Sequence, residues 1–248
     1  MNASIDSILE QMHPISLSEM QDIHLMDRVD SKFIAPVALL PELLETAIPY
    51  YKVQVNNGKR IASYATQYLD TPALDFFTMH QTGKPNRQKI RIRSYIDSHI
   101  SFLEIKNRND RGRTRKIRVP VEISHIQTID DLHANRSFLE KHSIFDSRHL
   151  EPVLGVTFDR ITLVNNHVTE RVTFDLNLSF LNYRTGSKKT AGPLLILELK
   201  QDGWFPSDFH DILNRFNIKQ VSFSKYCMGT ALTNPDIKYH LETETMIL

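Results

Sequence analysis

The stretch that decides the fold is residues 88–118, which read QKIRIRSYIDSHISFLEIKNRNDRGRTRKIR. Three short runs within it, 89–93, 103–106 and 116–121, alternate charged and aliphatic residues with a period of two. Because successive side chains of a strand face opposite sides of a sheet, each run predicts one charged face and one apolar face. His99 and the cluster at 109–112 have turn-forming character. The stretch therefore predicts three antiparallel strands joined as a meander.

The charged face of this meander can be explained in two ways. The first explanation is a solvated sheet face, the usual fate of alternating polar residues. The second is a basic groove or lumen that binds a polyanion. Two cations about 5 Å apart repel by roughly 3 kcal/mol at an effective dielectric constant near 20, so crowding them is unfavourable unless carboxylates, water or phosphates offset it. The meander alone leaves both explanations open.

Length and composition favour one soluble domain that spans residues 1–248. The chain is long enough for a sizeable core and has no linker, repeat or low-complexity tract. The formal net charge is +1, so any polyanion site must come from local clustering, and no nucleic-acid partner is expected. The single cysteine, Cys227, excludes an intramolecular disulfide and is expected to be a core thiol. The absence of a signal peptide and of a membrane segment predicts a cytoplasmic protein.

The rest of the chain alternates predicted helices and strands. Helices are expected in 1–24, broken at Pro14, and in 37–48, 72–81, 124–142 and 206–216, with a last helix after 221–226. Strands are expected at 27–34, 60–69, 153–164, 168–178 and 194–200, and residues 235–248 read as a loose tail. The helix at 72–81 is expected to be capped by Thr71.

The second half of the chain repeats charge at alternating strand positions. Arg160 is in phase with Phe158, Arg171 with Asp175, and Glu198 with Lys200. An antiparallel sheet of seven or eight such strands can avoid exposed edges by closing into a barrel. If the charges point inward, helices must cover the aliphatic outside; the alternation itself allows either direction.

The order and spacing of nine segments resemble a known family. These segments are DRVDSKF, YLDT, RQKIRIRSY, FLEIKNR, GRTRKIRV, FDR, ERVTFDLNL, LILELK and FSKYCMG. Together they resemble the polyphosphate polymerase domain of the vacuolar transporter chaperone (VTC) family, within the CYTH-like triphosphate tunnel metalloenzymes. The resemblance implies an α+β fold, a closed antiparallel barrel of eight strands with helices packed outside. It also implies an inward basic lining that takes a nucleoside triphosphate or polyphosphate, with a divalent ion.

Carried over by position, the resemblance also implies roles for individual residues. The expected catalytic side chains are Lys106, Arg160 and Arg171. The expected phosphate-binding side chains are Lys32, Arg91, Arg93, Lys116, Arg118, Lys200 and Lys225. Glu198 matches the metal-binding glutamate, which would hold Mn²⁺ or Mg²⁺ together with phosphate oxygens. These residue types suit phosphoryl transfer, which needs charge stabilisation and in-line positioning more than covalent help.

One departure from the wider superfamily bears on the reaction. Hydrolytic relatives carry two glutamates and a lysine alternating on the first strand, whereas this chain has Arg28, Asp30 and Lys32. Fewer carboxylates weaken the case for a metal-activated water and favour a transferase. The expected reaction is transfer of the γ-phosphoryl group of ATP to phosphate or polyphosphate. The alternatives are a triphosphate or polyphosphate hydrolase on the same lumen and a non-catalytic polyanion-binding module. In any of the three, carboxylates such as Glu104 and Asp175 are expected to pair with neighbouring cations.

Overall fold

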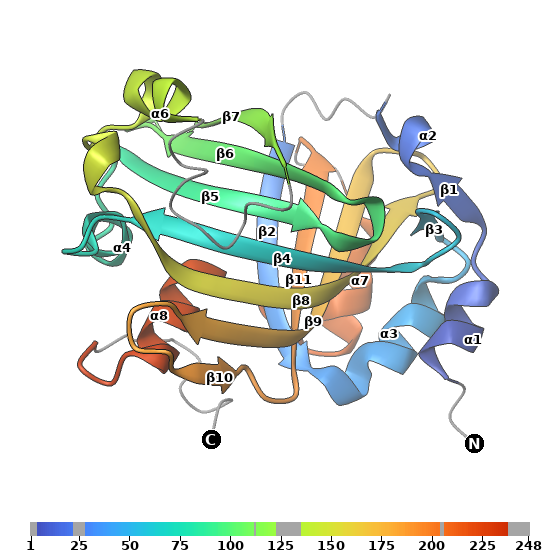
Figure 1. The fold of residues 1–248 in the computed structure, drawn as a ribbon. Coiled ribbons are helices and arrows are strands. Elements are labelled where there is room, and N and C mark those ends of the chain that lie inside the picture. The colour runs from blue at the N-terminus through green and yellow to red at the C-terminus, as the bar shows by residue number, and fades with distance from the viewer. Residues whose placement is uncertain (1–3, 22–27, 112, 123–134, 204–205, 238–248) are drawn as a thin grey trace.

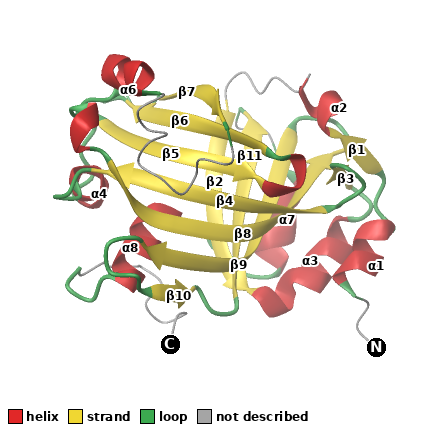
Figure 2. Cartoon of the chain, in the orientation of Figure 1, coloured by secondary structure: helices red, strands yellow, loops and turns green. Residues whose placement is uncertain are grey.

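The computed structural model describes residues 4–21, 28–111, 113–122, 135–203 and 206–237 (Figure 1). The fold is α+β, with a large sheet and helices on its flanks (Figure 2). Parts of the predicted 27–34 strand and 124–142 helix, and most of the predicted tail, lie outside the described residues.

Eight strands form the continuous path of the sheet, in the order β2-β11-β9-β8-β4-β5-β6-β7. Their bounds are β2 Arg28–Pro36, β4 Ile61–Asp70, β5 Arg87–Tyr95, β6 Ile100–Arg108, β7 Thr114–Val121, β8 Glu151–Asn165, β9 Glu170–Asn182 and β11 Leu194–Asp202. Every neighbouring pair on this path is antiparallel. The predicted meander is therefore confirmed as β5-β6-β7, and the expected strand number is confirmed for the path.

Three short strands that the sequence did not predict extend the sheet. They are β1 Pro14–Ser16, β3 Tyr51–Val55 and β10 Lys188–Thr190. β1 pairs in parallel with β3, which in turn pairs with β8, and β10 pairs with β9. These strands have three to five residues, too few for a period-two pattern to stand out.

The sheet curls strongly, so that β2 and β11 lie behind β4, β5 and β8 in Figure 1. Within the described residues, the hydrogen-bonded path ends at β2 on one side and β7 on the other, and these two strands do not pair with each other. The hydrogen bonds therefore do not confirm the expected closed barrel. The architecture they show is a curled sheet whose β2 edge carries an isolated antiparallel bridge between Phe33 and Gln220.

Helices flank this sheet (Figure 2). They are α1 Ile5–Glu10, α2 Leu17–Gln21, α3 Leu40–Ala47, α4 Asp75–Gln81, α6 Arg136–His142, α7 Asp208–Arg215 and α8 Lys225–Thr233. Short 3₁₀ turns occur at Val37–Leu39, Ile96–Ser98 and Ser147–His149. The prediction placed the start of α4 too early. Thr71 Oγ1 accepts a hydrogen bond from the Asp75 amide, as expected of a cap, but the Asp70 carboxylate caps the next two amides, those of Phe76 and Phe77.

The aliphatic faces of the strands pack outward, against the helices. Ile90, Ile92, Leu103 and Ile105 form one buried cluster with α4 and α6 side chains, Phe76 and Leu139 among them. Val172, Leu197 and Leu199 belong to a second cluster, which includes residues of α1, α3 and α7. Fully burying one such side chain stabilises a protein by about 1.5 to 3 kcal/mol, so these contacts fix which face of the sheet points outward. The charged faces consequently line the concave side, together with an apolar part on which α8 packs. There Tyr226 and Met228 share a buried cluster with Leu154 and Phe158.

Two smaller observations complete the fold. Cys227 is buried in α8, which confirms the prediction of a core thiol. In the part of the chain that the structure describes, none of the helices combines the length and the apolar character that crossing a bilayer requires.

Candidate functional site: an ionic cluster on the concave face

Three lysines stand side by side across the meander. Lys89 on β5 is opposite Lys106 on β6, and Lys106 is opposite Lys116 on β7. We call these three residues the lysine row. Like charges directly opposite each other on neighbouring strands are destabilising. The row therefore concentrates positive charge at a cost that something else in the protein or its ligand must offset.

The next row of the meander holds the first of three carboxylates that pair with cations at this site. Glu104 lies between Arg91 and Arg118 in the strand register. Its carboxylate accepts hydrogen bonds from Arg91 Nε at 2.8 Å and from Lys116 Nζ at 3.0 Å, and its side chain is only 1% exposed. Burial by itself would raise the pKa of Glu104, but Arg91, Arg93 and Lys116 lower it to about 2. Glu104 is therefore a fixed anion that holds cations in place.

Asp175 is the second buried carboxylate, on β9. It accepts hydrogen bonds from Arg160 Nε at 2.5 Å and Arg160 Nη2 at 2.8 Å, and from Lys225 Nζ at 2.5 Å. The two contacts to Arg160 form a bidentate pair, which fixes the orientation of the guanidinium. Burial opposes ionisation here too, yet Arg160 and Lys225 lower the pKa of Asp175 to about 2. Both Glu104 and Asp175 thus pair with cations, as the sequence predicted.

Glu198 is the third carboxylate, on β11. Its Oε2 contacts the ammonium group of Lys200, two residues further along the same strand, and Lys32 of β2 stands opposite it. Burial would raise the pKa of Glu198, but the charges of Lys200 and Lys32 lower it well below its usual value. Lys200 itself lies between Asp30 of β2 and Arg171 of β9 in the strand register.

The charges from opposite ends of the strand order interact with one another. Burial lowers the pKa of Lys106, and the charges of Glu198 and Lys32 also act on it, the first raising its pKa and the second lowering it. Lys106 is on β6, far along the path from β11 and β2. Side chains of these strands can interact only across the concave side of the sheet. The meander and the β2-β11 edge therefore contribute to one site.

We call this site the ionic cluster. Its members are Asp30, Lys32, Lys89, Arg91, Arg93, Glu104, Lys106, Lys116, Arg160, Arg171, Asp175, Glu198, Lys200 and Lys225. The cations outnumber the carboxylates, although the net charge of the whole chain is only +1. An anion would therefore meet an excess of positive charge at the ionic cluster. The overall composition of the chain does not reveal this excess.

Burial and neighbouring charges change the pKa values of the lysines in the cluster. Burial is the main reason that the pKa of Lys89 falls to about 7, and Lys32, Lys106 and Arg91 lower it further, while Cys227 raises it. Burial also lowers the pKa of Lys225, although Asp175 acts in the opposite direction. Near neutral pH, Lys89 is therefore poised between its charged and neutral forms. A bound anion would favour the charged form.

Two aromatic rings lie under the arginines. Tyr64 and Phe158 are stacked with 5.1 Å between ring centroids. The guanidinium of Arg160 lies 5.1 Å from the Tyr64 centroid and 5.2 Å from the Phe158 centroid. Arg93 lies 5.9 Å from the Tyr64 centroid, and its buried Nε has no hydrogen-bond partner among the described residues. A buried donor without a partner costs about 1 to 3 kcal/mol, and a phosphate oxygen is one acceptor that could satisfy Arg93.

The start of α8 delivers polar groups to the same site. Ser224 caps α8 by accepting from the Cys227 amide, and its Oγ also accepts a hydrogen bond from Lys89 Nζ at 3.0 Å. Lys32 Nζ donates to the Phe223 carbonyl at 3.0 Å. Tyr226, next to Lys225, donates its hydroxyl proton to the fully buried Asp70. These contacts tie α8 to β2, β4 and β5, and thereby fix where Lys225 lies.

The structure brings most of the predicted site residues together. The predicted residues that belong to the ionic cluster are Lys32, Arg91, Arg93, Lys106, Lys116, Arg160, Arg171, Glu198, Lys200 and Lys225. Arg118 is exposed at the border of the cluster, where its guanidinium lies 4.3 Å from the Phe102 ring centroid. The prediction left out Lys89 and Ser224 as site residues. The strand alternation signalled Lys89, but nothing local in the sequence brings Ser224 to it.

Carboxylates are too few for a metal centre made of protein ligands alone. Among the described residues, no group of three or more His, Cys, Asp or Glu side chains is placed to hold a metal ion. Glu104 and Asp175 each already contact two cations. Glu198, with Asp30 two strand positions away across the β2-β11 pair, is the carboxylate best placed to share an ion with a bound phosphate.

Comparison with known proteins adds family and fold. The VTC domain matches residues 27–234. A putative adenylyl cyclase from Hippeastrum, described as having a dominant triphosphatase activity, superposes with a TM-score of 0.52 at 16% identity, covering 84% of this chain and 97% of that one. A putative adenylate cyclase from Bacillus halodurans gives a TM-score of 0.48 at 14% identity, with 82% and 96% covered. No curated protein matches the sequence.

Proposed function

Because the chain belongs to the VTC domain family, we propose that it is a polyphosphate polymerase-like phosphoryl transferase. In the proposed reaction the γ-phosphoryl group of ATP passes to phosphate or to the end of a polyphosphate chain. The observation that carries the proposal is the ionic cluster, an excess of cations held on the concave face of a sheet whose other face is buried under helices. Such an excess favours a highly charged anion over a neutral ligand.

The chemistry of the transfer matches the groups that are present. The bond between the γ-phosphorus and the β,γ-bridging oxygen breaks, ADP leaves, and a terminal phosphate oxygen of the acceptor forms the new bond. Negative charge spreads over the oxygens of the transferred group, so catalysis depends on positioning and electrostatic stabilisation. We assign the stabilising role to Lys106, Arg160 and Arg171. Arg160 is the best oriented of the three, because Asp175 holds two of its nitrogens.

Phosphate binding is assigned to the other cations of the cluster, with Arg93 foremost. Its buried Nε has no hydrogen-bond partner among the described residues and has already lost its hydrating water in the empty protein. An incoming phosphate oxygen would therefore form a hydrogen bond with Nε without a further desolvation cost for this donor. Arg91 differs, because Glu104 holds its Nε at 2.8 Å. We propose that Arg91 contributes mainly charge and Arg93 mainly direct contact.

We also propose that the ionic cluster works as a tunnel. The two edges of the sheet are not joined by hydrogen bonds in the described part, but charges of β6 act on charges of β2 and β11 across the concave side. An anion bound between them would draw both walls toward itself. In this proposal the tunnel is completed by electrostatic contacts rather than by strand pairing.

A divalent ion, Mn²⁺ or Mg²⁺, fits this site only if it shares phosphate oxygens. Glu198 is the residue that would hold it, since Glu104 and Asp175 are each bound by two cations. One protein carboxylate plus phosphate oxygens is a common way to bind Mg²⁺. When bound, the ion would neutralise charge on the phosphates.

The test is incubation of the purified protein with ATP and Mn²⁺, followed by separation of the products. A polymerase yields ADP and phosphate chains in matched amounts. A hydrolase yields ADP and single phosphate, and a binding module leaves ATP intact while tripolyphosphate still binds. Either of the last two results would contradict the proposed reaction.

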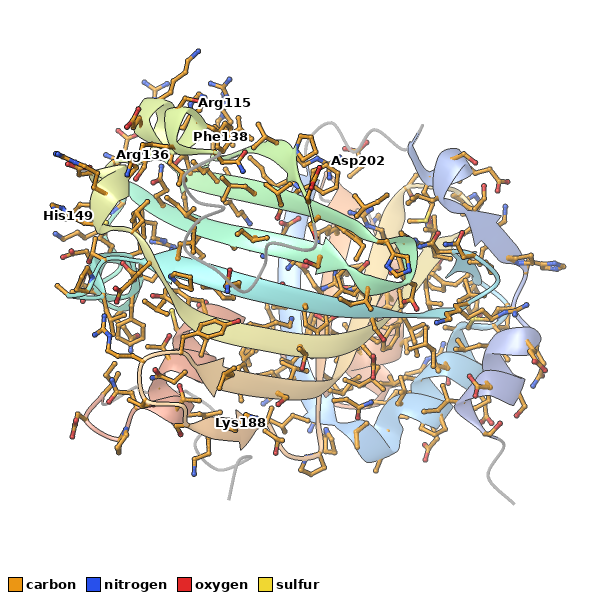
Figure 3. The ribbon with its side chains drawn as sticks, viewed as in Figure 1. Arg115, Arg136, Phe138, His149, Lys188 and Asp202 are labelled. Atoms are coloured by element: carbon orange, nitrogen blue, oxygen red, sulfur yellow. The ribbon has the colours of Figure 1, made fainter. Side chains whose placement is uncertain are left out.

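Matched variants show whether the ionic cluster is responsible. Arg93→Met and Arg160→Met should each lower the rate of chain synthesis by at least about a hundredfold, the scale typical of losing one stabilising donor. Lys188→Met is the control, because Lys188 is an exposed residue of β10, on the outside of the molecule (Figure 3). Equal rates in all three variants would place the reaction elsewhere.

A further inference from the structure

Glu198 differs from Glu104 and Asp175 in how it is neutralised. Among the described residues, Glu104 and Asp175 each form ion pairs with two cations, whereas Glu198 forms an ion pair with Lys200 alone. Lys200 and Glu198 are both on β11, two residues apart, so they project from the same face of the strand. Their pairing is therefore set within a single strand and does not hold two elements of the fold together.

The surroundings of Glu198 are strongly positive. Lys32 stands opposite it on β2. The charge of Arg160 also lowers the pKa of Glu198, and the charge of Glu198 raises the pKa of Lys106. A divalent cation that approached Glu198 in the empty protein would have to displace the Lys200 ammonium. It would also have to enter the repulsive field of the remaining cations.

A bound triphosphate would remove both obstacles, the pairing of Glu198 with Lys200 and the repulsion by the other cations. Its negative charge cancels the field of the neighbouring cations, and its oxygens offer the Lys200 ammonium a new partner. Lys200 also stands opposite Asp30, so it has an acceptor on the neighbouring strand when it leaves Glu198. Because a lysine side chain has a flexible four-carbon stem, this exchange requires rotamer changes and no movement of the strand.

We infer that Lys200 is the resident counter-ion of Glu198 and keeps divalent metal ions off this carboxylate until a triphosphate binds. The inference rests on the proposed function and adds an order to it. Glu198 becomes available to an ion only when phosphate oxygens are present to complete the ion's coordination. By thermodynamic linkage, metal ion and triphosphate then bind cooperatively.

The experiment measures Mn²⁺ binding to the full chain without triphosphate, from the electron paramagnetic resonance signal of free Mn²⁺. Wild type should bind Mn²⁺ weakly. Lys200→Met should bind it at least about tenfold more tightly, because the variant frees the carboxylate and removes a cation from its side. Lys200→Gln serves as a second variant should the methionine protein fold poorly.

Three further variants isolate the effect. Lys200→Arg keeps the charge and should behave as wild type, and Lys188→Met, on exposed β10, should also leave Mn²⁺ binding unchanged. The double variant Lys200→Met with Glu198→Gln should lose the gain, since the carboxylate is then absent. The inference is overturned if Lys200→Met and Lys200→Gln bind Mn²⁺ no better than wild type, or if the gain persists in the double variant.

A second titration separates this inference from the proposed function. Tripolyphosphate is added to wild type in buffer that contains EDTA, and binding is followed by calorimetry. If wild type binds tripolyphosphate but the Lys200 variants show no gain in Mn²⁺ affinity, only the counter-ion role fails. If wild type does not bind tripolyphosphate under these conditions, the proposed function fails with it.

Discussion

The middle of the lysine row offers a sharp test, because function and stability should respond in opposite directions. Lys106 stands between Lys89 and Lys116, one strand away on each side. Replacing it by methionine keeps most of the aliphatic stem and removes the charge. We expect Lys106→Met to leave the empty protein as stable as wild type or more stable, and to weaken the binding of tripolyphosphate.

The magnitude follows from Coulomb's law and from the charges that surround Lys106. Two ammonium groups at a separation of about 6 Å repel by roughly 0.7 to 3 kcal/mol for effective dielectric constants between 80 and 20. Removing Lys106 relieves its repulsion with Lys89 and Lys32, but also removes its attraction to Glu198 and Asp30, which lie across the concave side. The expected net change is a gain of about 1 kcal/mol, or roughly 2 to 4 °C in melting temperature for a chain of this size.

The assay is thermal unfolding at pH 6 and low salt, with and without tripolyphosphate, on wild type, Lys106→Met and Lys188→Met. The stability gain should shrink at 1 M salt, where exposed charges are screened within about 3 Å. Lys188→Met should match wild type throughout. If Lys106→Met is destabilised by more than 1 kcal/mol and binds tripolyphosphate as wild type does, the lysine row is a structural feature and the reasoning is wrong.

Three further outcomes are expected. Glu104→Gln should destabilise the protein by about 3 to 5 kcal/mol in chemical denaturation, because it leaves its two cations without a buried partner; a loss below 1 kcal/mol would show that solvent screens them. Gly229→Ala should cost about 1 to 3 kcal/mol, since the added Cβ would lie 2.4 Å from a ring carbon of Phe180, and an unchanged melting curve would contradict this packing. The pKa of Lys89 is about 7 in the folded protein and higher in the unfolded chain, so its contribution to stability should rise as pH rises through 7. The affinity for tripolyphosphate should fall over the same range, because Lys89 loses its charge. Lys89→Arg stays charged and should flatten the affinity profile, and identical profiles for the two proteins would contradict a role of Lys89 in binding.

Much of the fold followed from alternation along the strands. The charged and aliphatic residues of the meander predicted the three strands and which side chains share a face, because a period of two assigns every side chain to a face. The direction of that face was beyond the sequence. It became clear only when Ile90 and Ile92 were seen to pack against α4 and α6.

Contacts between distant segments account for what the sequence did not predict. Asp70 accepts hydrogen bonds from two amides of α4 and from the Tyr226 hydroxyl, a set that joins residues 156 positions apart. Ser224 meets Lys89 in the same way. No local pattern marks such pairs, since each residue alone looks like an ordinary cap or turn residue.

For the candidate site, too, local features could be predicted from the sequence and contacts between distant strands could not. The identity and face of each charged residue came from the sequence, and its resemblance to the VTC family named most of the cluster. The pairing could not be predicted, because it depends on which strands meet across the concave side. Glu104 and Asp175 each bind two cations there, whereas Glu198 pairs with its own strand neighbour.

The central claim is that the ionic cluster exists to bind a chain of phosphates, and the melting temperature of wild type with tripolyphosphate tests it most directly. At a concentration about a hundred times the dissociation constant, binding to the folded state alone adds roughly 2.7 kcal/mol, or about 5 to 10 °C. The account predicts this rise at low salt, a smaller rise at high salt, and little change with single phosphate, which spans few of the cations. An unchanged melting temperature with tripolyphosphate at low salt would contradict the claim.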